Sequence, residues 1–343
     1  MKALVLTGYN HFEYRDIFQP QVGPEDVLVE VRACGICGSD VHGMNGSTGR
    51  RIPPIVMGHE ASGVVAEVGG RVGDLNVGDR VTFDSTVYCG RCGFCRRGDV
   101  NLCDRRRVLG VSCGEFRQDG AFAQFVAVPQ HIVCRLPEGL SFERAAMAEP
   151  VSIAVHGVHR LPIRLSDTAV VVGTGMIGLL AVQALRSAGC GRIFAVDIDR
   201  ARLELACRLG ADEALSPEEV DVPAEVIRRT GGRGADVALE AVGIPSTVAT
   251  AIAAVRKGGC VSLVGNLTPR VDLPLQAVVT REITLLGSCA SRGEYPVCLE
   301  MIARGAIDVD ALTSAVAPLA EGAQWFERLA KRDEGLLKVI LQP

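Results

Sequence analysis

The chain has 343 residues, of which 48% are hydrophobic and 22% are charged, and its formal net charge is −4. This length exceeds what one hydrophobic core usually supports, so two domains are expected, and the composition is that of a globular protein. The acidic balance argues against nucleic-acid binding, because the basic run at residues 105–107 is short and isolated.

Residues 1–150 contain short β-prone runs separated by glycine, proline, aspartate and asparagine. Such a rhythm predicts a barrel-like all-β unit with long loops. The clearest runs are residues 3–6, 27–31, 63–68, 80–83 and 122–128. The N-terminal residues hold one lysine and a short apolar run, which does not fit a secretory signal, so a cytoplasmic location is expected.

Two short segments of this part carry side chains that bind metals. The first reads CGICGSDVH and the second reads GHE. Neither is diagnostic alone, because a single cysteine is usually a core residue and a His-Glu pair usually lies on the surface. Together with a later glutamate they offer the sulfur, nitrogen and oxygen donors that suit zinc. The candidate donors are Cys37, His59, Glu60 and Glu149.

Four of the thirteen cysteines lie in one loop rich in glycine and arginine, at Cys89, Cys92, Cys95 and Cys103. Four thiolates at this spacing close a tetrahedral zinc shell with no open position, so the lobe at about residues 86–106 is predicted to hold a structural zinc. Disulfide pairing is the alternative, which a chain without a secretory signal disfavours. The remaining scattered cysteines are expected to be small buried hydrophobic residues.

From about residue 155 the pattern alternates between strands and helices. Residues 169–172 form a fully apolar run, as a buried parallel strand does. Such alternation predicts an α/β domain with a doubly wound parallel sheet. The other expected strands are residues 193–196, 236–241, 261–264 and 283–286, and the expected helices are residues 177–187, 200–209 and 248–255. The apolar stretch 168–185 is not interpreted as a membrane span, because its three glycines have a diagnostic spacing and polar residues end it.

The sequence VVVGTGMIG is a strand followed by GxGxxG at the start of a helix, which predicts a dinucleotide-binding loop. Gly173 is expected to make the tight turn, Gly175 to admit the pyrophosphate, and Gly178 to let helix and strand pack closely. Asp197 ends the next strand, where its carboxylate would accept hydrogen bonds from the adenosine ribose and repel a 2′-phosphate. NAD is therefore predicted over NADP. A glycine-rich turn with a surface aspartate is the alternative.

Further residues are expected to line the cofactor site. They are Met176, Ile177, Arg202, Val242 and Val264. Arg202 would stack on the adenine or weaken the preference for NAD.

After about residue 290 the pattern predicts a helix at residues 295–304 and an apolar strand at 337–341. A tail of this length is short for a separate domain, so we expect it to complete the first one. The expected domains are residues 1–152 with 291–343, and residues 153–290.

Taken in order, CGSDVH, GHE, the four-cysteine lobe and GxGxxG resemble the motifs of the zinc-containing medium-chain dehydrogenases and reductases, along the whole chain. Within that superfamily the sequence is similar to the sorbitol (L-iditol) and other polyol dehydrogenases, with galactitol-phosphate and threonine dehydrogenases as near relatives. The resemblance implies a GroES-like catalytic domain, a Rossmann cofactor domain, NAD, two zinc ions per chain, and a homotetramer or homodimer.

The resemblance also implies the ligands of a catalytic zinc. Cys37 and His59 correspond to two of them, and Glu149 to the third protein position. Glu60 corresponds to a residue that binds the metal in some relatives and only supports it in others. A glutamate where other alcohol dehydrogenases have cysteine suits a vicinal diol, which is a hypothesis linking this site to polyols.

The implied reaction oxidises a secondary hydroxyl of a polyol to a ketone. Zinc lowers the pKa of the bound hydroxyl, and the carbon delivers hydride to NAD. Ser39 corresponds to the hydroxyl that takes the substrate proton, and His42 to the far end of that relay. Asp40 corresponds to a carboxylate that orients His59.

The sequence departs from sorbitol dehydrogenase near the substrate. Gly43 replaces an aromatic residue, and residues 290–291 are Ala-Ser where that enzyme has an Arg-Tyr pair. A phosphorylated polyol, received by Arg50, Arg51 or Arg292, therefore stays open, as does threonine, although surface charge also explains these arginines. A zinc- and NAD-binding protein without turnover is the alternative from another class, and the joint presence of ligand and relay residues favours an enzyme. No nucleic-acid or membrane partner is expected.

Overall fold

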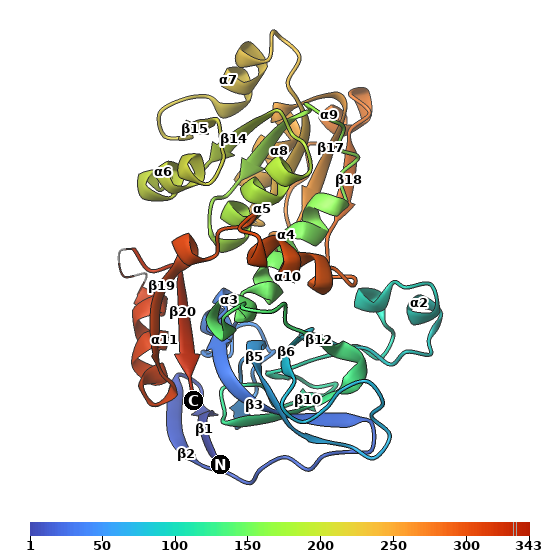
Figure 1. The fold of residues 1–343 in the computed structure, drawn as a ribbon. Helices are drawn as coiled ribbons and strands as arrows, with labels where there is room; N and C mark the ends of the chain where they lie inside the picture. The colour runs from blue at the N-terminus through green and yellow to red at the C-terminus, as the bar shows by residue number, and fades with distance from the viewer. Residues whose placement is uncertain (332, 334) are drawn as a thin grey trace. The chain divides into compact units, whose positions relative to one another are not determined.

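Figure 1 shows a computed structural model of the chain, which describes residues 1–331, 333 and 335–343. The chain divides into two compact units. Unit 1 comprises Met1–Glu149, Ser291–Gly305 and Val309–Pro343, and unit 2 comprises Pro150–Ala290 and Ala306–Asp308. Each unit has its own core of buried aliphatic and aromatic side chains. Within the described residues, no helix has both the length and the apolar character needed to cross a membrane.

The main sheet of unit 1 runs in the order β12-β6-β5-β3-β20-β19, and β11 also pairs with β3. A smaller sheet has the order β2-β1-β4. The main-sheet strands are β3 (Asp26–Gly35), β5 (Glu60–Val68), β6 (Arg80–Phe83), β11 (Phe125–Pro129), β12 (Val133–Arg135), β19 (Thr313–Pro318) and β20 (Lys338–Gln342). The smaller sheet contains β1 (Lys2–Gly8), β2 (His11–Asp16) and β4 (Ile55–Val56). The prediction of a β-rich first unit is confirmed.

Short elements fill the loops of unit 1. The helices are α1 (Gly38–Gly43), α2 (Gly93–Arg96) and α3 (Phe142–Ala146), and the short strands are β7 (Thr86–Val87), β8 (Arg107–Val108), β9 (Val111–Ser112) and β10 (Arg117–Gln118). The helix α4 (Ala148–His159), which the sequence pattern did not predict, begins at the end of this unit and continues into unit 2.

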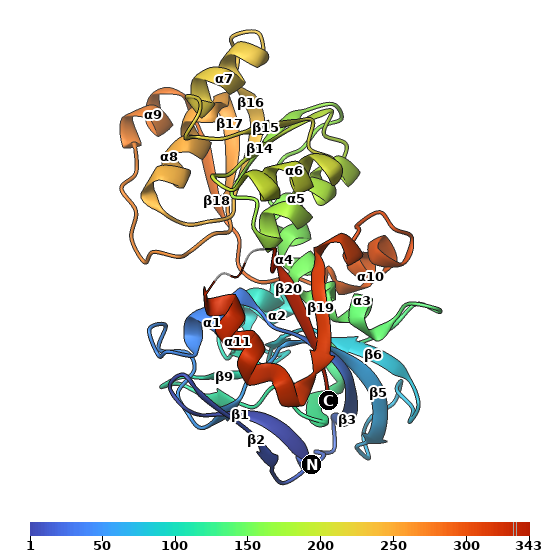
Figure 2. The same ribbon diagram turned by 90° about the vertical axis from the view of Figure 1, so that its left-hand side faces the viewer.

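The C-terminal segment completes the main sheet of unit 1. Strand β20 pairs antiparallel with β3, where Leu341 lies opposite Cys34 and Ile340 opposite Gly35. The predicted helix and strand of this segment are present as α10 (Tyr295–Ala303) and β20. Strand β19 and helix α11 (Gly322–Lys331) were not predicted, and α11 packs against β2 and α1. Both chain ends lie at the same end of this unit in both views (Figures 1 and 2).

Unit 2 is built on a six-stranded sheet in the order β15-β14-β13-β16-β17-β18, and all its pairings are parallel. The strands are β13 (Thr168–Val172), β14 (Arg192–Val196), β15 (Glu213–Leu215), β16 (Ala235–Glu240), β17 (Val255–Leu263) and β18 (Thr284–Gly287). The helices are α5 (Met176–Ser187), α6 (Arg200–Arg208), α7 (Val222–Arg229), α8 (Pro245–Ala254) and α9 (Leu275–Thr280). Figure 2 shows α5 and α6 on one face of the sheet and α8 and α9 on the other. The predicted doubly wound domain is confirmed.

Some sequence-based expectations need correction. The helix predicted at 248–255 begins earlier, at Pro245, because proline suits the first turn of a helix. The strand predicted at 261–264 begins earlier, at Val255. Among the scattered cysteines that were expected to be buried, Cys207 and Cys289 are exposed and Cys113 and Cys134 are half-buried.

Candidate metal and cofactor sites

The four cysteines of the lobe converge on one point. Their sulfur atoms all lie within 4.8 Å of one another, and all four are free thiols. A tetrahedron of Zn–S bonds of about 2.3 Å has S···S edges of about 3.8 Å, so the cluster fits a zinc ion after small adjustments. The members are Cys89, Cys92, Cys95 and Cys103. The disulfide alternative is not what the structure shows.

Backbone N–H groups favour the thiolate form in this lobe. A hydrogen bond from the N–H of Arg91 leads the effects that lower the pKa of Cys89 to about 6. The N–H of Cys95 similarly lowers the pKa of Cys92, whose sulfur caps α2. Cys103 Sγ accepts hydrogen bonds from the N–H groups of Cys89 and Arg105, each at 3.3 Å. Thiolates are the ligands that zinc requires, so the local backbone prepares Cys89 and Cys92 for a metal, whereas burial raises the pKa of Cys95 to about 12.

The second donor cluster follows from the pairing of β3 with β5. Gly35 at the end of β3 lies opposite Glu60 at the start of β5, so the residues just beyond both strand ends come together. Ligand atoms of Cys37, His59 and Glu60 lie within 4.8 Å of one another, and His59 and Glu60 are buried. A side chain at Gly35 would place its Cβ 2.3 Å from Glu60 Oε2, so this glycine makes room for the carboxylate.

Glu60 forms a buried ion pair that the sequence pattern did not indicate. Its Oε2 lies 2.5 Å from Lys338 Nζ, which also donates to the carbonyl of Ile36 at 3.0 Å. The side chains are 1% and 2% exposed. Burial alone would lower the pKa of Lys338, but the charge of Glu60 outweighs it and the pKa is raised, so the lysine is a cation. One oxygen of Glu60 therefore faces Lys338. The only sequence signal was a lysine within an apolar terminal strand.

Glu149 lies near this cluster but is not among the three residues whose ligand atoms meet. It is 7% exposed, and its Oε1 accepts a hydrogen bond from Ser85 Oγ at 3.0 Å. Burial raises its pKa to about 7, the charge of His59 lowers it and that of Glu60 raises it further. A divalent cation would offset the cost of ionising this buried acid. The neighbouring thiol, imidazole and second carboxylate are also donors that zinc accepts, so these residues fit zinc.

Ser85 was missed by the sequence analysis, because nothing in its local sequence marks it. Its backbone N–H donates a hydrogen bond to the buried hydroxyl oxygen of Tyr295 at 3.4 Å. The neighbouring Asp84 accepts from Thr86 N at 2.8 Å and Ser291 Oγ at 3.3 Å. The loop that contacts Glu149 is thus fixed by residues from far along the chain.

The helix α1 carries the other predicted residues of this site. Asp40 Oδ2 lies 3.5 Å from His59 Nδ1, which leaves Nε2 of the imidazole as the ring nitrogen available to a metal. Burial alone would lower the pKa of His59, but Asp40 and Cys37 outweigh it and raise the pKa to about 10. His42 is exposed, and the described residues include no hydrogen bond between its ring and Ser39.

Two arginines considered for a phosphate are already paired. Arg51 is 4% exposed and binds Asp40, so its interpretation as a surface charge is wrong. Arg292 Nη1 donates to Asp99 Oδ1 at 2.9 Å, which ties the C-terminal segment to the cysteine lobe. Arg50 is exposed.

The glycine-rich loop of unit 2 has the shape expected of a dinucleotide cradle. Gly173 has a φ of +91°, and a Cβ there would lie 2.3 Å from Val242 Cγ2. A Cβ at Gly178 would lie 1.8 Å from the carbonyl oxygen of Gly173, so helix α5 approaches the strand as closely as glycine allows. At Gly175, the N-cap of α5, an added Cβ would meet no atom within 4 Å. The open space therefore faces a helix N-terminus, which binds phosphate groups.

The other predicted cofactor residues surround this loop. Asp197 Oδ2 accepts the N–H of Thr174 at 2.6 Å, which joins the acidic residue to the loop. Arg202 pairs with Asp199 at 3.4 Å. Met176 and Ile177 form the first turn of α5, and Val264 follows the carboxyl end of β17. Because ligands of doubly wound sheets bind at the carboxyl ends of strands, this placement fits a dinucleotide.

A unit with two zinc-type donor clusters and a unit with a dinucleotide cradle define a metal-dependent oxidoreductase. Residues 23–138 match the alcohol dehydrogenase GroES-like domain, and residues 177–304 match the zinc-binding dehydrogenase family. The chain belongs to the family of zinc-binding alcohol dehydrogenases.

Individual relatives narrow the comparison. The chain is 34% identical to sorbitol dehydrogenase of Bacillus subtilis, over 100% of this chain and 97% of that protein. It is also 34% identical to D-arabitol-phosphate dehydrogenase of Enterococcus avium, over 98% and 95% of the two chains. A zinc-binding dehydrogenase from Sinorhizobium meliloti, solved with bound NADP, superposes with a TM-score of 0.91 at 33% identity, covering 100% of this chain and 99% of that one.

Proposed function

We propose that the chain oxidises a secondary hydroxyl of a polyol to a ketone with NAD as the hydride acceptor. The observation that carries this proposal is the convergence of Cys37, His59 and Glu60 beside the buried Glu149. Its donor set combines one thiol and one imidazole with carboxylates, and relatives of similar length are named for polyol substrates. Unit 1 would hold two zinc ions and unit 2 the cofactor.

Zinc held by Cys37, His59 and a carboxylate supplies Lewis acidity toward a hydroxyl, and NAD supplies a hydride acceptor. The chain's own residues do the rest. Asp40 fixes the ring orientation of His59, and Ser39 takes the proton that leaves the substrate hydroxyl. The hydride leaves the same carbon, so one proton and one hydride account for the two-electron oxidation.

Glu149 and Glu60 have different surroundings, and we propose different roles for them. Glu60 is neutralised by Lys338 at 2.5 Å, so we propose that it supports the metal site electrostatically. Glu149 is buried, accepts a hydrogen bond from Ser85 Oγ at 3.0 Å and lies within the field of His59 and Glu60, so we propose it as the third protein ligand. The test is zinc content: Glu149→Gln should lower occupancy of the catalytic site more than Glu60→Gln does.

We propose NAD over NADP because Asp197 follows β14 and accepts the N–H of Thr174 in the glycine-rich loop, where its carboxylate would meet the ribose. The two nearby arginines that would attract a 2′-phosphate are each paired with an acid, Arg200 with Glu219 at 2.5 Å and Arg202 with Asp199 at 3.4 Å. The Sinorhizobium relative was solved with bound NADP. The steady-state kcat/KM should be higher with NAD than with NADP in the native chain. Asp197→Ser should reduce the ratio of the two kcat/KM values by about ten-fold or more.

An unphosphorylated polyol is proposed over a phosphorylated one, since Arg51 and Arg292 are both held by acidic partners. The deciding experiment is NADH formation with sorbitol, xylitol, L-iditol, galactitol, galactitol 1-phosphate, L-threonine and ethanol, each with NAD and NADP, before and after chelation of zinc. Metal-dependent turnover of free polyols supports the proposal. No turnover by protein that carries two zinc ions per chain would favour a binding protein without catalytic activity.

We further propose a cytoplasmic homodimer or homotetramer. Free cysteines and a thiolate lobe suit a reducing compartment. Strand β18 is an edge of the parallel sheet, and exposed apolar side chains lie in the segment before it, at Leu273, Leu275 and Val279. Light scattering on the zinc-loaded protein measures the mass, and a monomer would contradict the proposal.

A further inference from the structure

The buried arginine beside α1 contacts two residues of the proton-transfer and metal sites at once. Arg51 Nη2 lies 2.8 Å from Asp40 Oδ1 and 3.4 Å from Ser39 Oγ, and its Nε lies 3.1 Å from the same Asp40 oxygen. The other Asp40 oxygen faces His59 Nδ1 at 3.5 Å. One guanidinium thus connects the relay hydroxyl with the carboxylate that orients a metal ligand.

The backbone and a neighbouring glycine hold Arg51 in this place. Residues on either side of it pair with Ser112: the N–H of Ile52 donates to the Ser112 carbonyl at 3.0 Å, and the N–H of Ser112 donates to the Arg50 carbonyl at 3.2 Å. Gly43 lies against its aliphatic stem, and a Cβ at that position would be 2.5 Å from Arg51 Cγ. The absence of a side chain at Gly43 therefore makes room for Arg51.

The direction of the contact with Ser39 follows from chemistry. A guanidinium has five donors and no acceptor, so Arg51 donates and Ser39 Oγ accepts. The contact occupies one lone pair of the hydroxyl oxygen and keeps the hydroxyl hydrogen of Ser39 turned away from Arg51. The second lone pair remains for an incoming proton, and the hydrogen remains for onward transfer.

We propose that Arg51 is a positioning residue of the dehydrogenase reaction, which sets the orientation of the Ser39 hydroxyl and of Asp40 together, and that Gly43 exists to admit its stem. This inference rests on the proposed function. As the O–H bond of the substrate breaks, an O–H bond forms on Ser39 Oγ, and the proton that Ser39 carried passes outward to solvent water. The electron pair of the C–H bond leaves with the hydride to NAD. Arg51 exchanges no proton.

A purely structural role for Arg51 would be neutralisation of the buried Asp40. Lysine carries the same charge and separates the two roles, because its single ammonium group lacks the planar fork that spans Asp40 and Ser39 together. Arg51→Lys should keep the fold and both zinc ions while it releases Ser39. Arg71→Lys is the matched control, since Arg71 is exposed and its nearest acidic contact, Glu25, is 3.6 Å away.

For Arg51→Lys we expect kcat to fall about ten-fold or more, KM for the polyol to change by less than about three-fold, and the solvent deuterium isotope effect on kcat to increase. Arg71→Lys should match the native enzyme. A native kcat and isotope effect in Arg51→Lys would overturn the proposal. So would a loss of activity that only follows a loss of zinc, because charge neutralisation alone then explains the residue.

Gly43→Ala is a second variant that changes no charge and no donor. Gly43 has no positive φ, so alanine suits its backbone, but the added methyl group must displace the stem of Arg51. We expect the same fall in kcat and the same rise in isotope effect as in Arg51→Lys, and native behaviour would count against the role of Gly43.

A readout independent of turnover separates this proposal from the proposed function. In cobalt-substituted protein, Arg51→Met should shift the visible absorption bands of the metal, because Asp40 loses its partner and His59 its support, whereas Arg71→Met should not. If native protein oxidises none of the alcohols, the proposed function fails, and the cobalt spectrum still tests the link from Arg51 to His59. An unchanged spectrum in Arg51→Met overturns that link.

Discussion

Single buried charges decide the stability of the catalytic region. Lys338 and Glu60 are fully enclosed, and each neutralises the other. Removing one member of such a pair leaves an uncompensated charge in a medium of low dielectric, which costs far more than the pair itself contributes.

Lys338→Met should therefore lower the free energy of unfolding of the zinc-loaded protein by about 3–5 kcal/mol. Lys331→Met is the control, because Lys331 is 72% exposed and 3.9 Å from Glu327, and it should change stability by less than about 1 kcal/mol. Urea denaturation measures both. Equal, small effects of the two substitutions would mean that Glu60 finds another partner when the lysine is absent.

The glycines of the cofactor loop separate packing from binding. Gly178→Ala forces a methyl group to 1.8 Å from the Gly173 carbonyl, so it should destabilise unit 2 and weaken NADH binding together. Gly175→Ala meets no protein atom and has an extended backbone at φ −70°, so the fold should persist. Its methyl group fills the pyrophosphate cradle, and we expect the Kd for NADH to rise about ten-fold or more. NADH fluorescence titration and thermal melts give the two readouts. Tight NADH binding by Gly175→Ala would place the cofactor elsewhere.

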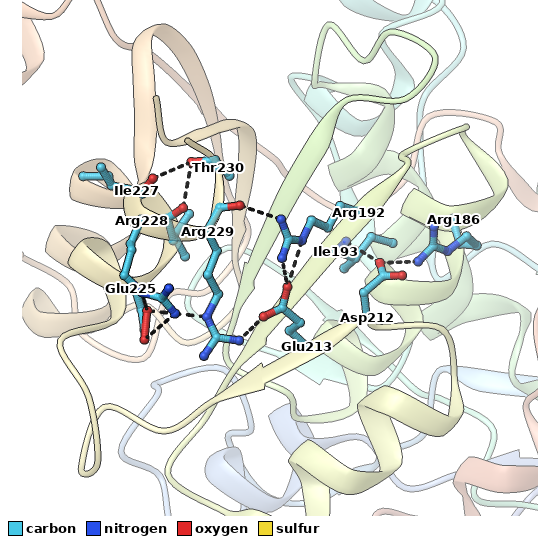
Figure 3. A network of polar contacts seen from close by, with 11 residues as sticks. Arg186, Arg192, Ile193, Asp212, Glu213, Glu225, Ile227, Arg228, Arg229 and Thr230 are labelled. Carbon is cyan, nitrogen blue, oxygen red and sulfur yellow. Dashed lines mark hydrogen bonds and ion pairs between the residues drawn. The ribbon is translucent and has the colours of Figure 1, made fainter. Parts of the chain in front are cut away.

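At the scale of elements, the outer strands of unit 2 are tied to α7 by an ion-pair network, shown in Figure 3. Glu213 on β15 binds Arg192 on β14, with Arg192 Nε at 2.8 Å, and also binds Arg229 on α7. Burial alone would raise the pKa of Glu213, but hydrogen bonds from Arg229 and Arg192 outweigh it and lower the pKa. The ionised carboxylate is thus more favourable in the folded state than in the unfolded chain.

The sign of the pH dependence follows from this lowered pKa. Above about pH 4.5, the ordinary value, the contribution of Glu213 to stability is complete, and it is lost as the pH falls through the lower folded value. Glu213→Gln should lower the free energy of unfolding by about 1 kcal/mol at neutral pH, and the difference in stability between the variant and the native protein should shrink in acid. The exposed Glu218→Gln is the control. A difference that is constant down to low pH would exclude the ion pairs as its cause.

The cysteine lobe is a second element held together by few contacts. The contacts that hold it include the four thiols, the Arg292–Asp99 pair and the Arg97–Asp99 pair. Cys95→Ser should therefore remove one zinc ion per chain and make residues 89–103 sensitive to proteolysis, while Cys113→Ser, a cysteine outside the cluster, should do neither. Metal analysis and limited digestion provide the measurements. Retention of both zinc ions by Cys95→Ser would contradict a four-thiolate site.

For the whole molecule, the sequence indicated what depends on local pattern and missed what depends on distant partners. Strand–turn–helix signals fixed the sheet of unit 2, and cysteine spacing indicated the lobe. The strand β19 and the helices α4 and α11 had no such signals. Lys338 and Ser85 escaped notice, and Arg51 was considered only for a phosphate, because their partners are set by the fold: Lys338 meets Glu60 across 278 residues and Ser85 meets Tyr295 across 210. Burial and pairing of this kind have no local sequence signature.

The two units hold separate ligand sets, which predicts separate thermal responses. Both zinc-type clusters lie within unit 1, and the glycine-rich loop with Asp197 lies within unit 2. A ligand stabilises the unit that binds it, so chelation of zinc should lower the midpoint temperature of the calorimetric transition of unit 1. NAD at about a hundred times its Kd should raise the free energy of unfolding of unit 2 by about 2.7 kcal/mol. The Gly175→Ala variant, which is expected to bind NAD weakly, should show the zinc response and a reduced NAD response. A single transition that moves with either ligand would mean that the units unfold together, and the stabilisation by each ligand would then extend over the whole chain.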